Sequence, residues 1–116
     1  MKPPFIVDDS GDLSIFESVE EAERYLEPND VEPGKCLAYD SEGRCLEGFD
    51  ESKWFRHRVR LGPREGQPTH APELLRGRLL YVLEGLETKE THEQLASLPL
   101  NELVAVAVEH LLSRDH

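Results

Sequence analysis

Short segments rich in apolar residues, each bounded by polar and turn-forming residues, occur in the first half of the chain. Apolar runs at 5–7 and 13–16 surround one cluster of turn-forming residues, and runs at 35–39 and 44–49 surround another. Such short runs bounded by turn residues are typical of strands, and a short turn rich in Asp, Ser and Gly joins two strands into a hairpin. The four runs therefore predict two β-hairpins.

The longest alternating segment runs from Lys53 to Leu61. Within it, Phe55, His57 and Val59 share one face with Leu61, and three arginines share the other face. This regular alternation predicts one continuous strand. His57 is then expected to be a half-buried histidine of the apolar face rather than a catalytic group.

The first helical pattern begins at Ser18. Ser18 and Glu21 match a capping box, in which each side chain binds a free backbone N–H of the first turn. Pro28 is expected to end this helix, because proline lacks the N–H that the helical ladder requires. The predicted inward face consists of Val19, Ala22, Tyr25 and Leu26.

Helical spacing of apolar residues dominates the second half, after an irregular stretch at 62–72 that is rich in proline and glycine. A helix is predicted to start at Pro72, and a second capping box at Thr91 opens a short helix that ends before Pro99. Asn101 is expected to cap the last helix. The inward faces are predicted to be Leu75, Leu79, Val82, Leu83 and Leu86 in the first helix, and Leu103, Val104, Ala107, Val108, Leu111 and Leu112 in the last.

The predicted order of elements is β-β-α-β-β-β-α-α-α. Hairpins imply an antiparallel sheet, here of four to five strands, and the three helices that follow make the fold α+β. The chain has 116 residues, which suits one domain, so residues 1–116 are expected to fold as a single domain.

Charge is distributed unevenly along the chain. Residues 1–52 contain 15 acids and four bases, whereas residues 53–116 contain nine of each, so the net charge of −11 comes from the first 52 residues. Affinity for phosphate depends mainly on Lys and Arg, so nucleic acid is not an expected partner. A strongly acidic half instead favours docking on a basic protein.

The sequence also indicates where the protein resides. No apolar run approaches the roughly 20 residues that span a bilayer, so no membrane association is expected. The amino terminus lacks the apolar stretch of a secretory signal, and a cytoplasmic location is expected.

The two cysteines, Cys36 and Cys45, are too few for a disulfide framework. On a hairpin that turns at Ser41-Glu42-Gly43, Cys45 is expected to face Asp40 or its neighbour, and Cys36 a residue near Phe49. The sulfurs would then lie about 13 Å apart along the ladder, which is too far to bridge. The cysteines are therefore predicted to be small buried hydrophobic residues.

No pattern of catalytic or metal-binding residues is present in the sequence. The five histidines are scattered singly, and the acids of Asp8-Asp9-Ser10-Gly11-Asp12 lack the spacing of a calcium loop. The sequence contains neither a phosphate-binding glycine loop nor a dinucleotide fingerprint. We therefore expect no metal, no cofactor and no enzymatic activity.

One basic feature allows an alternative function. Arg56, Arg58 and Arg60 are spaced so that they share one strand face, where three cations can hold an anionic ligand of a binding protein or enzyme. They can equally pair with acids of a neighbouring strand, such as Glu42 or Glu47.

The acidic half is the main candidate for partner binding. Its carboxylates are expected to contact lysines and arginines of a basic partner, and an aromatic side chain such as Trp54 or Tyr39 to anchor the contact. Trp54 in the core is the competing interpretation. The predicted contact residues are Asp12, Glu17, Glu20, Glu21, Tyr39, Asp40, Glu42, Glu47 and Trp54.

The amino-terminal pattern is the most specific feature of the chain. It consists of FIVDDSGDLSIFESVEEAE at 5–23, YLEP at 25–28 and AYDSEGR at 38–44. This pattern resembles the opening of small acidic bacterial immunity-type proteins, the partners of secreted antibacterial toxins, over about residues 1–46. The resemblance implies a non-catalytic protein that neutralises one cognate toxin by occluding its active site. Whether the chain also forms a homo-oligomer stays open.

Overall fold

The computed structural model describes residues 2–9, 12–32, 35–63, 72–86 and 90–111. The strands are β1 (Phe5–Asp9), β2 (Asp12–Phe16), β3 (Cys36–Tyr39), β4 (Cys45–Asp50) and β5 (Val59–Pro63). The helices are α1 (Val19–Tyr25), the short 3-10 helix η1 (Pro28–Asp30), α2 (Pro72–Glu84), α3 (His92–Ser97) and α4 (Leu100–Leu111). The predicted element order and the α+β class are confirmed.

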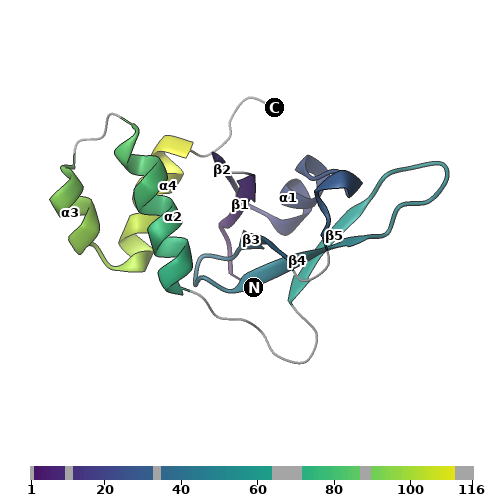
Figure 1. Ribbon diagram of the computed structural model, residues 1–116, viewed down its shortest axis with the longest axis horizontal. Coiled ribbons are helices and arrows are strands. Elements are labelled where there is room, and N and C mark those ends of the chain that lie inside the picture. The colour runs from purple at the N-terminus through teal and green to yellow at the C-terminus, as the bar shows by residue number, and fades with distance from the viewer. Residues whose placement is uncertain (1, 10–11, 33–34, 64–71, 87–89, 112–116) are drawn as a thin grey trace.

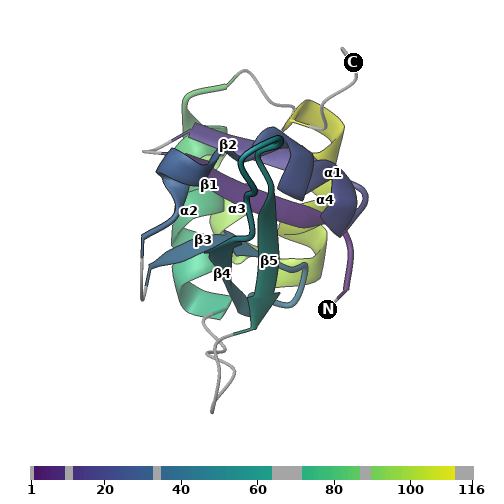
Figure 2. The same ribbon diagram turned by 90° about the vertical axis from the view of Figure 1, so that its right-hand side faces the viewer.

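The five strands form one antiparallel sheet in the order β2-β1-β3-β4-β5. Helix α1 covers one face of the sheet, and α2 and α4 cover the other, with α3 on their far side (Figure 1). Figure 2 shows β4 and β5 crossing the direction of β1 and β2, so the sheet is strongly twisted. The twist carries the β4–β5 end of the sheet away from α2 and α4 (Figure 1).

Two hydrophobic cores follow from the alternation of side chains along the strands. Ile6 of β1 points into the core beneath α2 and α4, where it joins Leu79 and Leu103. Its neighbours Phe5 and Val7 point to the opposite core, beneath α1. Because consecutive side chains of a strand point to opposite faces, the apolar run at 5–7 contributes to both cores.

The helix ends agree with most of the expectations from sequence. The Ser18 hydroxyl accepts a hydrogen bond from the Glu21 N–H at 3.2 Å, and Thr91 forms the full capping box with Gln94. Asn101 is not the cap of the last helix. The Pro99 carbonyl accepts the first helical hydrogen bonds, so α4 begins at Leu100.

Two residues assigned to inward faces, Leu86 and Tyr25, are exposed. Leu86 follows the end of α2 and is exposed, because the helical stripe stops at Glu84. Tyr25 is also exposed, with its ring 5.1 Å from the ring of Phe16, since it lies at the edge of the face that α1 buries. Leu112 lies outside the described residues, and so do residues 64–71 of the irregular stretch. Gly62 and Pro63 continue β5, and Pro72 begins α2 as predicted.

The prediction of one strand from Lys53 to Leu61 is wrong. Strand β5 begins only at Val59, and the chain reverses at Trp54 and Phe55, where Lys53 and Arg56 form an isolated bridge. Alternation continues on both sides of the reversal, so the pattern alone does not mark the turn. Phe55 and His57 are exposed because this end of the hairpin extends beyond the helices that cover the sheet.

The prediction of unbridged cysteines is also wrong, because Cys36 and Cys45 form a disulfide. Cys45 faces Tyr39 as expected, but a β-bulge between Cys36 and Ala38 places Cys36 opposite Glu47 rather than near Phe49. Since residues two apart on a strand share a face, Cys36 becomes the diagonal neighbour of Cys45. Their Cα atoms lie 5.5 Å apart, which is within bridging distance.

Replacing both cysteines by serine is expected to lower the free energy of unfolding by about 2–3 kcal/mol. The physical reason is that the crosslink closes a loop of roughly ten residues and so restricts the unfolded chain. Urea unfolding of the oxidised wild type and of the double variant measures the loss, and wild type with reductant is the matched control. Two freely alkylated thiols in the native, unreduced protein would contradict the crosslink.

Candidate functional site

The β4–β5 hairpin ends in a projection that we call the hairpin arm (residues 51–58). The Glu51 N–H donates to the Arg58 carbonyl at 2.9 Å, and the Lys53 N–H donates to the Arg56 carbonyl at 2.9 Å. These bonds extend the strand pairing past Asp50 towards the tip. Figure 1 shows the arm reaching away from the body of the protein, beyond α1.

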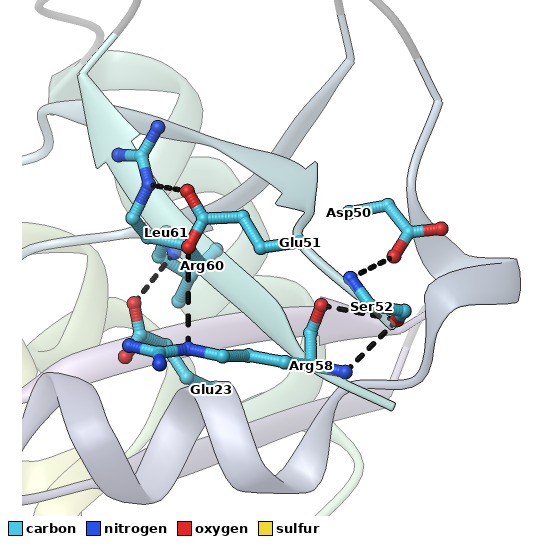
Figure 3. Close-up of polar contacts among 7 residues, drawn as sticks. All are labelled: Glu23, Asp50, Glu51, Ser52, Arg58, Arg60 and Leu61. Atoms are coloured by element: carbon cyan, nitrogen blue, oxygen red, sulfur yellow. Dashed lines mark hydrogen bonds and ion pairs between the residues drawn. The ribbon is translucent and has the colours of Figure 1, made fainter. Parts of the chain in front are cut away.

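Ser52 holds the two sides of the arm together (Figure 3). Its hydroxyl accepts a hydrogen bond from the Arg58 N–H at 2.9 Å and lies 3.3 Å from the Arg58 carbonyl, to which it donates. The Ser52 N–H donates to Asp50 Oδ1 at 2.9 Å. Hydrogen bonding to the side chain and backbone of Ser52 lowers the pKa of the exposed Asp50 carboxyl. The pair Asp50 and Ser52 has the spacing of an Asx turn, the one sequence signal that could have located the arm.

Glu51 forms ion pairs with two of the three arginines, Arg58 and Arg60. Its carboxylate lies 2.7 Å from Arg60 Nε and 4.0 Å from Arg58 Nε (Figure 3). The Arg60 guanidinium also lies over the ring of Phe49, 4.4 Å from its centroid. Arg58 and Arg60 therefore pair with a neighbouring carboxylate, which is that of Glu51.

The tip of the arm presents two aromatic rings to solvent. Trp54 is 96% exposed and Phe55 is 62% exposed, and their rings meet edge to face with centroids 5.3 Å apart. The cations Lys53 and Arg56 flank them in sequence. Trp54 is therefore not a core residue. Phe55, which the strand prediction placed in the core, is an exposed residue of the tip.

A groove of about 720 Å³ separates α1 from the arm. Its lining residues are Glu20, Glu23, Arg24, Leu26, Glu27, Pro28, Asn29, Arg56, His57, Arg58 and Val59. Acidic side chains of α1 and its C-terminal flank thus face the basic side chains of the arm. Glu23 Oε2 accepts a hydrogen bond at 2.7 Å from the N–H of Leu61, on the edge strand β5 (Figure 3).

The predicted contact residues are divided among several places. Glu17, Glu20 and Glu21 are exposed on α1 or immediately before it. Asp12 is exposed at the start of β2, at the opposite edge of the sheet. Glu47 points to the face opposite α1, since its neighbour Leu46 lies in the core beneath α1. Of these predicted residues, only Glu20 lines the groove.

Two of the predicted contact residues, Tyr39 and Asp40, are buried, and their side chains contact other parts of the fold. The Tyr39 ring is 3% exposed in the core beneath α2. Burial, and secondarily the negative charge of Asp8, raise the pKa of Tyr39. Asp40 is fully buried, and its carboxylate accepts hydrogen bonds from the N–H groups of Lys2, Glu42 and Arg44.

The raised pKa of Tyr39 predicts a loss of stability in alkali. A group whose pKa is higher in the folded state stabilises the fold below its ordinary pKa, here 10.0, and this contribution is lost as the pH rises through the folded value. We expect the urea midpoint to fall less between pH 8 and pH 11 in Tyr39→Phe than in wild type. Tyr81→Phe, at an exposed position of α2, is the control and should follow wild type.

Over the described residues, no cluster of three or more His, Cys, Asp or Glu side chains is arranged to hold a metal ion. Among the same residues, no helix is long and apolar enough to cross a membrane. Comparisons with protein-family models, curated proteins and solved structures find no match for this chain.

Proposed function

We propose that the chain is a non-catalytic binding protein of the immunity type, which neutralises a basic toxin by covering its active site. The observation that carries this proposal is the density of exposed carboxylates on and next to α1, of which Glu20 and Glu27 line the groove. Residues 17–32 contain seven acids and one base. We call the exposed acids of this segment the acidic ledge, which consists of Glu17, Glu20, Glu21, Glu27 and Glu32.

Electrostatic complementarity explains how such a ledge would inhibit a toxin. Toxins that act on nucleic acids or nucleotides hold phosphate with lysine and arginine, and carboxylates of the ledge would pair with the same cations. Opposite charges also speed the encounter of two proteins and disfavour wrong partners. The aromatic tip at Trp54 supplies the anchor, since Trp is frequent among the residues that dominate interface energy.

The lining of the groove supports binding rather than catalysis. It contains no Ser, Thr or Cys side chain to act as a nucleophile, and His57 is its only imidazole. The alternative anion site of Arg56, Arg58 and Arg60 receives less support. Arg58 and Arg60 share the carboxylate of Glu51, and only Arg56 and Arg58 line the groove, together with three glutamates.

Charge reversal tests the proposal. The tagged chain is used at low salt to capture its partner from the source organism, and mass spectrometry gives the stoichiometry. We expect one basic protein at 1:1, with a Kd that weakens steeply with salt and an association rate at least about tenfold slower for Glu20→Lys/Glu21→Lys. Glu109→Lys, on α4 across the sheet, is the matched control and should associate like wild type. A Kd that is independent of salt would contradict the electrostatic mechanism.

The small-anion alternative makes a separate prediction. If the arginines form the site, phosphorylated or carboxylated small molecules should raise the melting temperature, and Arg58→Ala should abolish the rise. We expect a broad anion panel to leave the melting temperature unchanged, because Glu20, Glu23 and Glu27 balance the charges of Arg24, Arg56 and Arg58 in the lining of the groove.

The location of the protein can be tested through its thiols. A cytoplasmic location remains a prediction from the sequence, whereas the disulfide between Cys36 and Cys45 favours an oxidising compartment. Rapid alkylation of living cells distinguishes a reducing from an oxidising compartment. If the two thiols are protected from alkylation, the crosslink forms in the compartment where the protein acts.

A further inference from the structure

Two aromatic residues form the turn of the hairpin arm. Lys53 and Arg56 exchange both backbone hydrogen bonds, at 2.9 and 3.0 Å, so Trp54 and Phe55 are the central residues of a two-residue loop. Asn-Gly and Asp-Gly are the usual pairs in such loops, because they adopt the required backbone conformation at low cost. Neither ring belongs to a core of the described residues, so internal packing does not explain these two large apolar side chains. A local preference that is broken at an exposed position indicates binding.

Two cations lie directly behind the rings. The Cα atoms of a hydrogen-bonded pair in an antiparallel ladder are about 5.5 Å apart, so Lys53 and Arg56 flank the turn at one level. Over the described residues neither of them forms an ion pair, whereas Arg58 and Arg60 share the carboxylate of Glu51 nearer the sheet. The tip therefore has an apolar end followed by two unpaired positive charges.

The acids of α1 lie behind the tip. Helix α1 packs over Val59 of β5, and at about 3.3 Å per residue Val59 is roughly 13 Å from Phe55 along the arm. Salt at physiological ionic strength screens charges over about 8 Å. Figure 1 shows the arm reaching beyond α1 at one end of the molecule. A surface that approaches the tip end-on therefore meets the rings and the two cations before it meets the acids.

The shape of the tip restricts the kind of partner. A two-residue turn is convex, so it offers no cleft to a small ligand. A single-stranded nucleic acid needs rings and cations spread along a groove that follows its backbone. Here the two rings are adjacent and lie at 84° to each other, so successive bases could not stack on both. The headgroup layer of a phospholipid bilayer is soft enough to receive a convex tip, and Trp is enriched there because its apolar ring carries a polar N–H.

We propose that the arm tip docks reversibly on a phospholipid surface that contains anionic lipids. The rings of Trp54 and Phe55 enter the layer between the headgroups and the acyl chains, and Lys53 and Arg56 contact lipid phosphates. Such a contact requires no membrane-spanning helix. The net charge of −11 opposes a closer approach of the rest of the chain, so the binding is weak and reversible. This docking goes beyond the proposed function, because lipid and a toxin would compete for the same rings.

The fluorescence of Trp54 tests the proposal directly, because the chain contains no other tryptophan. The purified chain is titrated at physiological salt with vesicles of phosphatidylcholine and phosphatidylglycerol, mixed roughly three to one. We expect the emission to shift to shorter wavelength and the ring to be shielded from aqueous acrylamide, since it moves from water into an apolar layer. Vesicles of phosphatidylcholine alone should bind at least about tenfold more weakly, because the two cations gain less there.

Variants of the tip identify it as the contact surface. Lys53→Glu/Arg56→Glu should bind the mixed vesicles at least about tenfold more weakly than wild type, because both attractive charges become repulsive. Phe55→Ala should also bind more weakly, and it replaces the double variant if circular dichroism shows that the latter fails to fold. Tyr81→Ala, at an exposed position of α2, is the matched control and should bind like wild type.

Three outcomes would overturn lipid docking. The first is an emission of Trp54 that stays unchanged with vesicles, and the second is a wavelength shift that a folded charge-reversal variant retains. The third is quenching by a single-stranded oligouridine without any response to vesicles, which would assign the tip to nucleic acid instead. The test needs only the chain and lipid, so a negative result leaves the proposed function standing, and a failed partner capture leaves lipid docking standing.

Discussion

Replacing Trp54 by alanine is expected to weaken binding of the cognate partner by about 2–4 kcal/mol, or roughly 30- to 700-fold in Kd. Trp54 is 96% exposed at the end of a hairpin arm whose backbone is held by Ser52 and Arg58. A large ring on an ordered support loses little conformational entropy on binding, so most of its buried area contributes to affinity. Isothermal titration of the captured partner measures the effect.

Two variants separate the anchor role from a general loss of apolar surface. Tyr81 is 70% exposed on α2, which covers the face of the sheet opposite α1, so Tyr81→Ala should bind like wild type. Trp54→Phe keeps an aromatic ring and should recover part of the affinity. The melting temperature of Trp54→Ala should equal that of wild type, because the side chain is outside both cores. Wild-type affinity in Trp54→Ala would exclude the arm tip from the interface.

Replacing Asp40 by alanine is expected to lower the free energy of unfolding by about 3–4 kcal/mol. The buried carboxylate accepts hydrogen bonds from the N–H groups of Glu42 and Arg44, at 3.0 and 2.9 Å, and from Lys2 at 3.3 Å. Each hydrogen bond to a charged group contributes about 1.5–3 kcal/mol, and the alanine variant leaves the donors without an acceptor. Solvent recovers part of this loss once the turn loosens, and urea unfolding measures what remains.

Asp40→Asn is the matched control for this prediction. Its side-chain oxygen can still accept from Glu42 and Arg44, so we expect it to lose less than half as much stability as Asp40→Ala. The loss of stability in Asp40→Ala should extend to the start of α2, because the turn at Gly43 packs closely against Pro72. A Cβ on Gly43 would lie 2.6 Å from the Pro72 Cα. An unchanged urea midpoint in Asp40→Ala would show that the carboxylate does not organise the turn.

The two hairpins and four helices could be predicted because their signals are local. Ser18 and Thr91 mark helix starts by their own capping hydrogen bonds, and the apolar spacing of Leu75, Leu79 and Leu83 defines the buried face of α2. These features depend on residues three or four apart in the chain. They therefore follow from the sequence without knowledge of the fold.

The arm could not be predicted from the same kind of pattern. Alternation at 53–61 assigns side chains to the two faces of a strand, but it does not show whether a helix covers either face. Val59 and Leu61 are buried because α1 lies over them, whereas Phe55 and His57 are exposed on the arm, which the groove separates from α1. The interpretation of His57 as a core histidine failed for this reason, and so did the assignment of Phe55 to the core.

The sequence by itself determined the α+β class, the antiparallel hairpins and the helix boundaries to within a residue or two. It also determined the concentration of acids in the first 52 residues. Each of these is a property of neighbouring residues or of composition. Only the tertiary structure decided the pairing of Cys36 with Cys45, since one bulge shifts the register by a residue. It also decided which acids share a surface. Glu20 faces the groove while Tyr39 and Asp40 are buried, because burial depends on how helices pack across the sheet rather than on position in the chain.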